Sequence, residues 1–118
     1  MGVQQSQETG GLRAALANAM VALMKQYYGK GPTAAKSWIL DDYVFIVMEG
    51  GLTRNEETLL AAGREEVVRS YRLAFQAAVA EQTMKTMADL IGREVLTYHS
   101  QIVFHPTRSF EIFVLAPE

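Results

Sequence analysis

The chain has 118 residues, a length that suits one domain with an ordinary hydrophobic core. Its composition, 49% hydrophobic and 20% charged, is typical of a folded globular protein, and its net charge of −2 argues against indiscriminate nucleic-acid binding. The absence of cysteine excludes disulfides, thiolate nucleophiles and zinc–thiolate sites, and it fits a reducing cytoplasm.

The N-terminal segment does not have the pattern of a secretory signal. Residues 1–12 are polar and contain glycine, and they have neither a basic region nor an apolar run. The longest purely apolar run, residues 44–48, is far shorter than the roughly 20 residues that span a bilayer. We therefore expect a flexible polar arm at residues 1–10, a single domain at 11–118, a cytoplasmic location and no direct membrane insertion.

The first predicted elements are a helix and a hairpin. Apolar side chains recur with a period of 3.6 over residues 12–27 and predict a helix that ends at Gly29. Two short strands, 37–40 and 43–48, flank an Asp pair at 41–42 that suits a tight turn. Both alternating faces of the second strand are apolar, so this strand needs cover on both faces.

Two helices are predicted in the middle of the chain. Thr53 and Glu56 form a capping box at the start of a short helix, and Gly63 suits its left-handed end. A long helix follows at about 64–91, with a polar interruption at 82–83. A helix of this length measures about 40 Å, whereas a compact domain of this size is only about 35 Å across. The helix therefore either kinks near 82–83 or projects beyond its core.

The last quarter predicts a second hairpin, with strands at 94–104 and 110–115 around Pro106. The order α-β-β-α-α-β-β predicts an α+β fold in which two hairpins form one four-stranded antiparallel sheet with helices packed on it. The two-faced strand and the long helix together predict a homodimer. The alternative is a monomer whose helices cover both faces of the sheet.

The reactive side chains do not converge. His99 and His105 are separated by about 20 Å if they lie on one strand, too far to bind one metal. Asp41 and Asp42 point apart in a turn and do not form a general acid–base pair. We therefore expect no catalytic residues, no metal site and no cofactor, with a histidine-dependent activity as the alternative.

Four basic residues are candidates for an anion site. Lys30 lies in a glycine-containing segment, 29–36, that lacks the residue order of a phosphate loop. Lys30 and Lys36, with Arg54 and Arg64 near predicted helix starts, could converge on a small anion. The alternative is that the glycines serve turns and the charges are solvated.

Several motifs together resemble a small bacterial family over about residues 12–115. They include Tyr28-Gly29-Lys30-Gly31-Pro32-Thr33, Glu49-Gly50-Gly51-Leu52-Thr53, Arg72-x-x-Phe75-Gln76 and Glu111-Ile112-Phe113-Val114-Leu115. With them the chain resembles the MpsC family, named for a component of a sodium-translocating, membrane-potential-generating system and long regarded as a domain of unknown function.

The resemblance implies a small protein associated with membrane proteins that link sodium or proton flux to bicarbonate uptake, and it carries over no catalytic residue. The leading hypothesis is a non-enzymatic accessory or regulatory protein that acts through protein–protein contacts. Its partner would be a membrane-transport protein on the cytoplasmic side. The alternative is a sensor domain that binds a small anion or nucleotide near Lys30, Lys36, Arg54 and Arg64.

Overall fold

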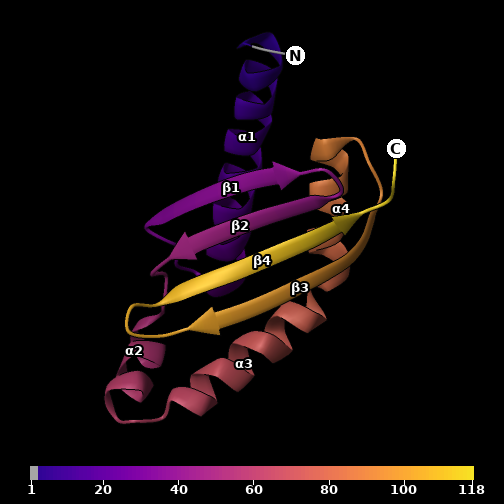
Figure 1. Cartoon of the computed structure of the whole chain (residues 1–118). Helices are drawn as coiled ribbons and strands as arrows, with labels where there is room; N and C mark the ends of the chain where they lie inside the picture. The colour runs from indigo at the N-terminus through magenta and orange to yellow at the C-terminus, as the bar shows by residue number, and fades with distance from the viewer. Residues whose placement is uncertain (1–2) are drawn as a thin grey trace.

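The computed structural model describes residues 3–118, with side chains from Gly10 onward. In chain order its elements are α1 (Val3–Tyr28), β1 (Ala34–Leu40), β2 (Tyr43–Glu49), α2 (Arg54–Ala61), α3 (Glu65–Ala78), α4 (Ala80–Ile91), β3 (Val95–Val103) and β4 (Arg108–Leu115). The α+β class is confirmed, although three helices separate the two hairpins where two were predicted (Figure 1).

Helix α1 is longer than predicted and ends where predicted. Gly29 has a φ of 79°, and its N–H donates to the carbonyl of Lys25 at 2.9 Å. Residues 3–10, expected to form part of a flexible arm, belong to the helix, and residues 1 and 2 lie outside the described part. The N-terminal half of α1 runs past the sheet, which gives the molecule extents of 51 × 26 × 20 Å (Figure 1).

The two hairpins join into one antiparallel sheet, as predicted. The strand order is β1-β2-β4-β3, so the hairpins meet through β2 and β4. In the middle of the sheet Phe45 of β2 lies opposite Trp38 of β1 and Ile112 of β4. This register decides which side chains share a face, because alternate residues of a strand point to opposite sides.

The predicted long helix at 64–91 is wrong in one respect, since the chain breaks at Val79 into α3 and α4. Val79 has φ −102° and ψ 11°, and the break lies three residues before the polar pair where a kink was expected. The break allows α4 to contact both α1 and β3, while α3 contacts β3 and α2. A straight rod of about 40 Å could not make both sets of contacts on a sheet this short.

The main core lies between the helices and one face of the sheet. It comprises Leu16, Met20, Leu23, Met24, Val44, Ile46, Met48, Met87, Phe113 and Leu115. A smaller cluster of Leu52, Val68 and Ile102 lies beneath α2 and α3. In the described part of the chain the helices that contact the sheet pack on one face only (Figure 1). The expectation that helices cover both faces of the sheet is therefore wrong, and the homodimer stays a prediction.

Candidate functional site

The uncovered side of the sheet, which we call the open face, is formed by every second residue of the four strands. Because Val44, Ile46 and Met48 point into the core, their neighbours on β2 point to the other side. The register gives the open face these members: Ala34, Lys36, Trp38 and Leu40 from β1; Tyr43, Phe45, Val47 and Glu49 from β2; Arg108, Phe110, Ile112 and Val114 from β4; and Thr97, His99, Gln101 and Val103 from β3.

The open face is apolar in its middle. Trp38, Leu40 and Tyr43 are 39%, 59% and 46% exposed, and the side chains of the two central strands are only partly buried by their neighbours. Polar side chains border this area along β3 and at the end of the sheet that carries Glu49 and Arg108. Contiguous apolar patches of this kind on a protein surface mark sites of interaction.

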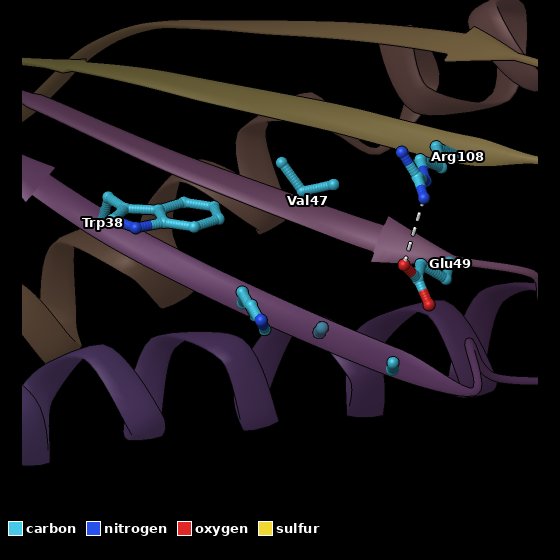
Figure 2. Close-up of a pocket in the computed structure, with 7 residues that line it drawn as sticks. Trp38, Val47, Glu49 and Arg108 are labelled. Atoms are coloured by element: carbon cyan, nitrogen blue, oxygen red, sulfur yellow. Dashed lines mark ion pairs between the residues drawn. The ribbon is translucent and has the colours of Figure 1, made fainter.

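A pocket of about 330 Å³ lies on the open face. Its volume is at the lower end of the usual range for ligand sites. Figure 2 shows Trp38 and Val47 on its apolar side and the pair of Glu49 and Arg108 at its end. Arg108 Nη2 is 3.6 Å from Glu49 Oε1, and both side chains are about half exposed. Lys36 adds a second cation to the lining. The pocket therefore combines an apolar wall with two positive charges, one of them paired.

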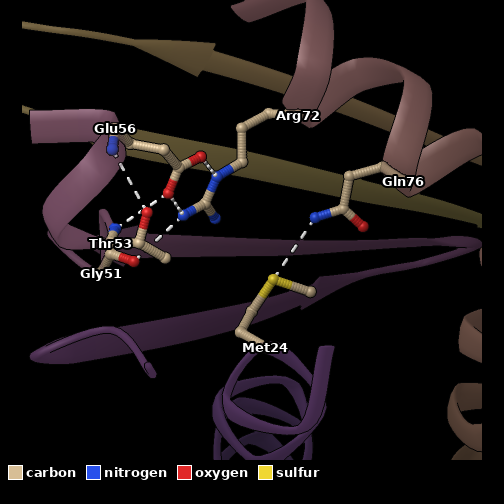
Figure 3. Close-up of polar contacts among 6 residues, drawn as sticks. All are labelled: Met24, Gly51, Thr53, Glu56, Arg72 and Gln76. Carbon is tan, nitrogen blue, oxygen red and sulfur yellow. Dashed lines mark hydrogen bonds and ion pairs between the residues drawn. The ribbon is translucent and has the colours of Figure 1, made fainter. Parts of the chain in front are cut away.

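A buried ion pair links α2 and α3 beneath the sheet (Figure 3). Arg72 Nε lies 2.6 Å from Glu56 Oε2, and Arg72 Nη2 donates to the carbonyl of Gly51 at 3.1 Å. The guanidinium also lies 3.7 Å from the ring centroid of Tyr28. Burial acts to raise the pKa of Glu56, but hydrogen bonds from Arg72 and Thr53 outweigh it and lower that pKa. The arrangement fixes α2 against α3 and leaves neither charge free for chemistry.

A second buried cluster surrounds Glu111 of β4, which is 0% exposed. Tyr98 Oη lies 2.9 Å from Glu111 Oε1 and 3.0 Å from Gln76 Oε1, and Ser100 donates to Glu111 Oε1 at 3.1 Å. A tyrosine has one hydroxyl hydrogen, so it cannot donate to both acceptors. If Glu111 is the neutral acid, it donates to Tyr98, and Tyr98 donates to Gln76.

The environment of Glu111 supports this protonation state. Burial raises the pKa of Glu111 to about 7, although hydrogen bonds from Ser100 and Tyr98 and the charge of Arg72 act in the opposite direction. Its Oε2 has no hydrogen-bond partner among the described residues. Burial likewise raises the pKa of Tyr98. Burial therefore favours the neutral form of the Glu111 carboxyl more strongly than water does.

The four predicted anion-site residues lie on four different segments, and all are exposed. Lys30 follows α1, Arg54 is the first residue of α2, and Arg64 immediately precedes α3. Lys36 lies on β1 and lines the pocket in Figure 2, where the other cation is Arg108. Sequence reasoning missed Arg108 because only the pairing of β2 with β4 brings it beside this pocket. Anion binding by the predicted four stays a prediction.

The two histidines lie in different parts of the last hairpin, and the two aspartates lie at the β1–β2 turn. His105 lies in the turn between β3 and β4, whereas His99 is exposed on the open face. Asp41 lies in the β1–β2 turn, and Asp42 pairs with Arg93 at 2.6 Å. Within residues 3–118 no group of three His, Cys, Asp or Glu residues is placed to hold a metal ion. Over the same residues no helix is long and apolar enough to cross a membrane.

The buried polar residues were not predicted, although the sequence carries a signal for them. Arg72 and Gln76 follow Val68 at intervals of four, which places all three on the buried side of α3. Glu111 has the same parity as Phe113 on β4, so it points into the core. A buried polar side chain can therefore be identified in the sequence as a polar residue at a position that the helical period of 3.6 or the strand period of 2 assigns to the core.

Comparison with known proteins gives one match. Neither a search of curated proteins nor a search of solved structures finds a match for this chain. The model of the MpsC family, described as the Na⁺-translocating membrane potential-generating system (MpsC), matches residues 8–117. Because this match covers nearly the whole of the 118 residues, the chain belongs to the MpsC family.

Proposed function

We propose that this chain is a non-enzymatic accessory or regulatory protein that acts as a homodimer in the cytoplasm and binds other proteins. Its partner is a protein of a membrane ion- or bicarbonate-transport system. The family name supports the association with a membrane-potential-generating system. The observation that carries the proposal is the open face, where Trp38, Leu40 and Tyr43 remain exposed on a sheet that the chain's helices cover on one side only.

The free energy available at the open face favours a contact surface. Removing apolar surface from water contributes about 25 cal/mol per Å², or about 1.5–3 kcal/mol for a large side chain that becomes fully buried. Aromatic residues such as Trp38, Tyr43 and Phe45 are the side chains that contribute most to binding at protein interfaces. The chain's most strongly perturbed carboxyl groups, Glu56 and Glu111, lie in the interior, where they do not face a substrate.

The test is affinity purification from native membrane extracts with the tagged full chain. We expect the wild type to recover an identified membrane-transport protein. Phe45→Lys on the open face should lose it, because the partner binds the homodimer and the substitution disrupts the apolar surface available to form that dimer. Val67→Lys is the matched control, because Val67 is an exposed apolar residue on α3, away from the sheet. The proposal fails if the wild type recovers no membrane-transport protein, or if both variants recover it equally.

The second candidate is a sensor that binds a small anion or nucleotide, and the pocket lined by Lys36 and Arg108 favours it. A ligand that binds only the folded state raises the melting temperature by mass action. Bicarbonate, phosphate and a nucleotide at millimolar concentration should then raise the melting temperature of the wild type and not of Lys36→Ala. Lys30→Ala, Arg54→Ala and Arg64→Ala test whether the predicted four act together. No shift with any of these anions would retire this candidate.

A further inference from the structure

We infer that two copies of this chain pack open face against open face, about a two-fold axis that runs parallel to the strands between β2 and β4. The existence of a dimer rests on the proposed function. The structure adds which surface forms it and how the two copies are oriented. Three features of the open face point to a second copy as the occupant: its area, the distribution of its side chains and the placement of its charges.

The area of the open face matches one small interface. Four strands about 4.8 Å apart and seven residues long at about 3.4 Å each give a face of about 19 × 24 Å, or about 450 Å² in projection. The relief of the side chains increases this area toward the roughly 600 Å² that each partner contributes at the lower limit of stable complexes. A stable contact therefore needs nearly the whole face, and a second copy of the same face covers all of it.

The side chains follow the pattern of an interface. The central strands contribute Tyr43, Phe45, Val47, Phe110 and Ile112, an apolar and largely aromatic middle. The polar side chains lie along β3 and at one end of the sheet, where water still reaches them after association. An apolar centre with a polar rim is the usual anatomy of protein interfaces. Two such faces pack as a sandwich, about 10 Å apart and inclined by about 30°.

The charges select the axis. Glu49 of β2 and Arg108 of β4 are cross-strand partners, so they lie on either side of the line between the two central strands. A rotation of 180° about that line places Arg108 of the second copy over Glu49 of the first, and the reverse contact follows by symmetry. A two-fold axis across the strands would instead place Glu49 over Tyr43, and a carboxylate would be buried against an aromatic ring.

The same axis matches large side chains with small ones. Val47 and Phe110 are cross-strand partners, so Phe110 of the second copy lies over Val47 of the first. Val47 lines the pocket of about 330 Å³, which Phe110 of the second copy enters. The pocket in Figure 2 is in this arrangement the recess that receives a side chain of the other copy. Lys36 lies over Gln101 of the second copy, with no like charges in contact.

The test measures the oligomeric state by sedimentation equilibrium, with circular dichroism to show that each variant is folded. We expect the wild type to be a dimer, Phe45→Glu to be monomeric and Val67→Glu on α3 to remain dimeric. Glu49→Arg and Arg108→Glu should each weaken the dimer by about tenfold or more, because each creates two like-charge contacts across the axis.

Mixing the two charge variants gives the decisive result. Within each variant chain the residues at 49 and 108 carry like charges, so they repel each other inside one chain and across the axis between two copies of the same variant. When the two variants pair with each other across the proposed axis, both contacts between positions 49 and 108 join opposite charges. We expect the mixture to form heterodimers although each variant alone is largely monomeric. A mixture that stays monomeric, or a wild-type dimer that tolerates Phe45→Glu, overturns the inference and leaves the proposed homodimer intact. A wild type that is monomeric at all concentrations overturns both.

Discussion

Replacing Glu111 by glutamine should change the pH dependence of folding. The pKa of Glu111 is raised from 4.5 to about 7 in the folded protein, chiefly because the carboxyl is buried. That difference corresponds to about 3 kcal/mol between the two protonation states. The folded state binds the proton more tightly than the unfolded state, so the contribution of Glu111 is fully present below pH 4.5 and lost as the pH rises through about 7.

The glutamine side chain of the Glu111→Gln variant has the shape of the neutral acid and cannot ionise. Tyr98 and Ser100 both contact Oε1 of Glu111, and an amide nitrogen in that position can donate to both hydroxyls. The variant should therefore match the wild type at pH 4 and exceed its free energy of unfolding by up to about 3 kcal/mol at pH 8. Urea unfolding at a series of pH values, followed by circular dichroism, measures this difference directly.

The control is Glu94→Gln, which removes an exposed carboxylate between α4 and β3. Its effect should stay within about 0.5 kcal/mol at both pH values, as for most surface substitutions. If Glu111→Gln changes stability equally at pH 4 and pH 8, or less favourably at pH 8 than at pH 4, then the pKa of Glu111 is not raised in the folded state. In that case the proton-sharing arrangement with Tyr98 and Gln76 is wrong.

Two further substitutions test the structure around the buried ion pair. Arg72→Met should destabilise the fold by about 3–5 kcal/mol in urea unfolding, because it removes the cation that pairs with the buried carboxylate of Glu56 and leaves that carboxylate only the N–H of Thr53. Adding Glu56→Gln to this variant should recover part of the loss, and an equal loss in the double variant would show that the charge is not the cause. Gly51→Ala should lower the melting temperature more than Gly63→Ala. Both glycines have a positive φ, but only at Gly51 would the added Cβ lie 3.1 Å from the backbone of Pro32. Equal shifts for the two alanine variants would contradict this.

Local features were predictable because neighbouring residues alone decide them. The capping box of Thr53 and Glu56, the left-handed Gly63 and the Asp41–Asp42 turn each depend on backbone geometry within a few residues. The two hairpins were predictable from short segments with the residue pattern of strands, joined by turn residues. Their combination into one antiparallel sheet was predictable from the order of the elements along the chain. The family was recognisable from the sequence for a related reason, since the motifs at 28–33 and 49–53 lie at turns and a cap, while the other two lie within α3 and β4.

The remaining features depend on contacts between distant segments. The break at Val79 places α4 against α1, a packing requirement that no local pattern contains. The pKa of Glu111 depends on side chains of β3 and α3 that close over it, and the pairing of Glu49 with Arg108 joins residues far apart in the chain. By itself the sequence determined that one strand is apolar on both sides. Only the tertiary structure decided that helices cover one of those sides and leave the other open. The reason is that the connections between helices and strands along the whole chain determine on which face of the sheet each helix packs.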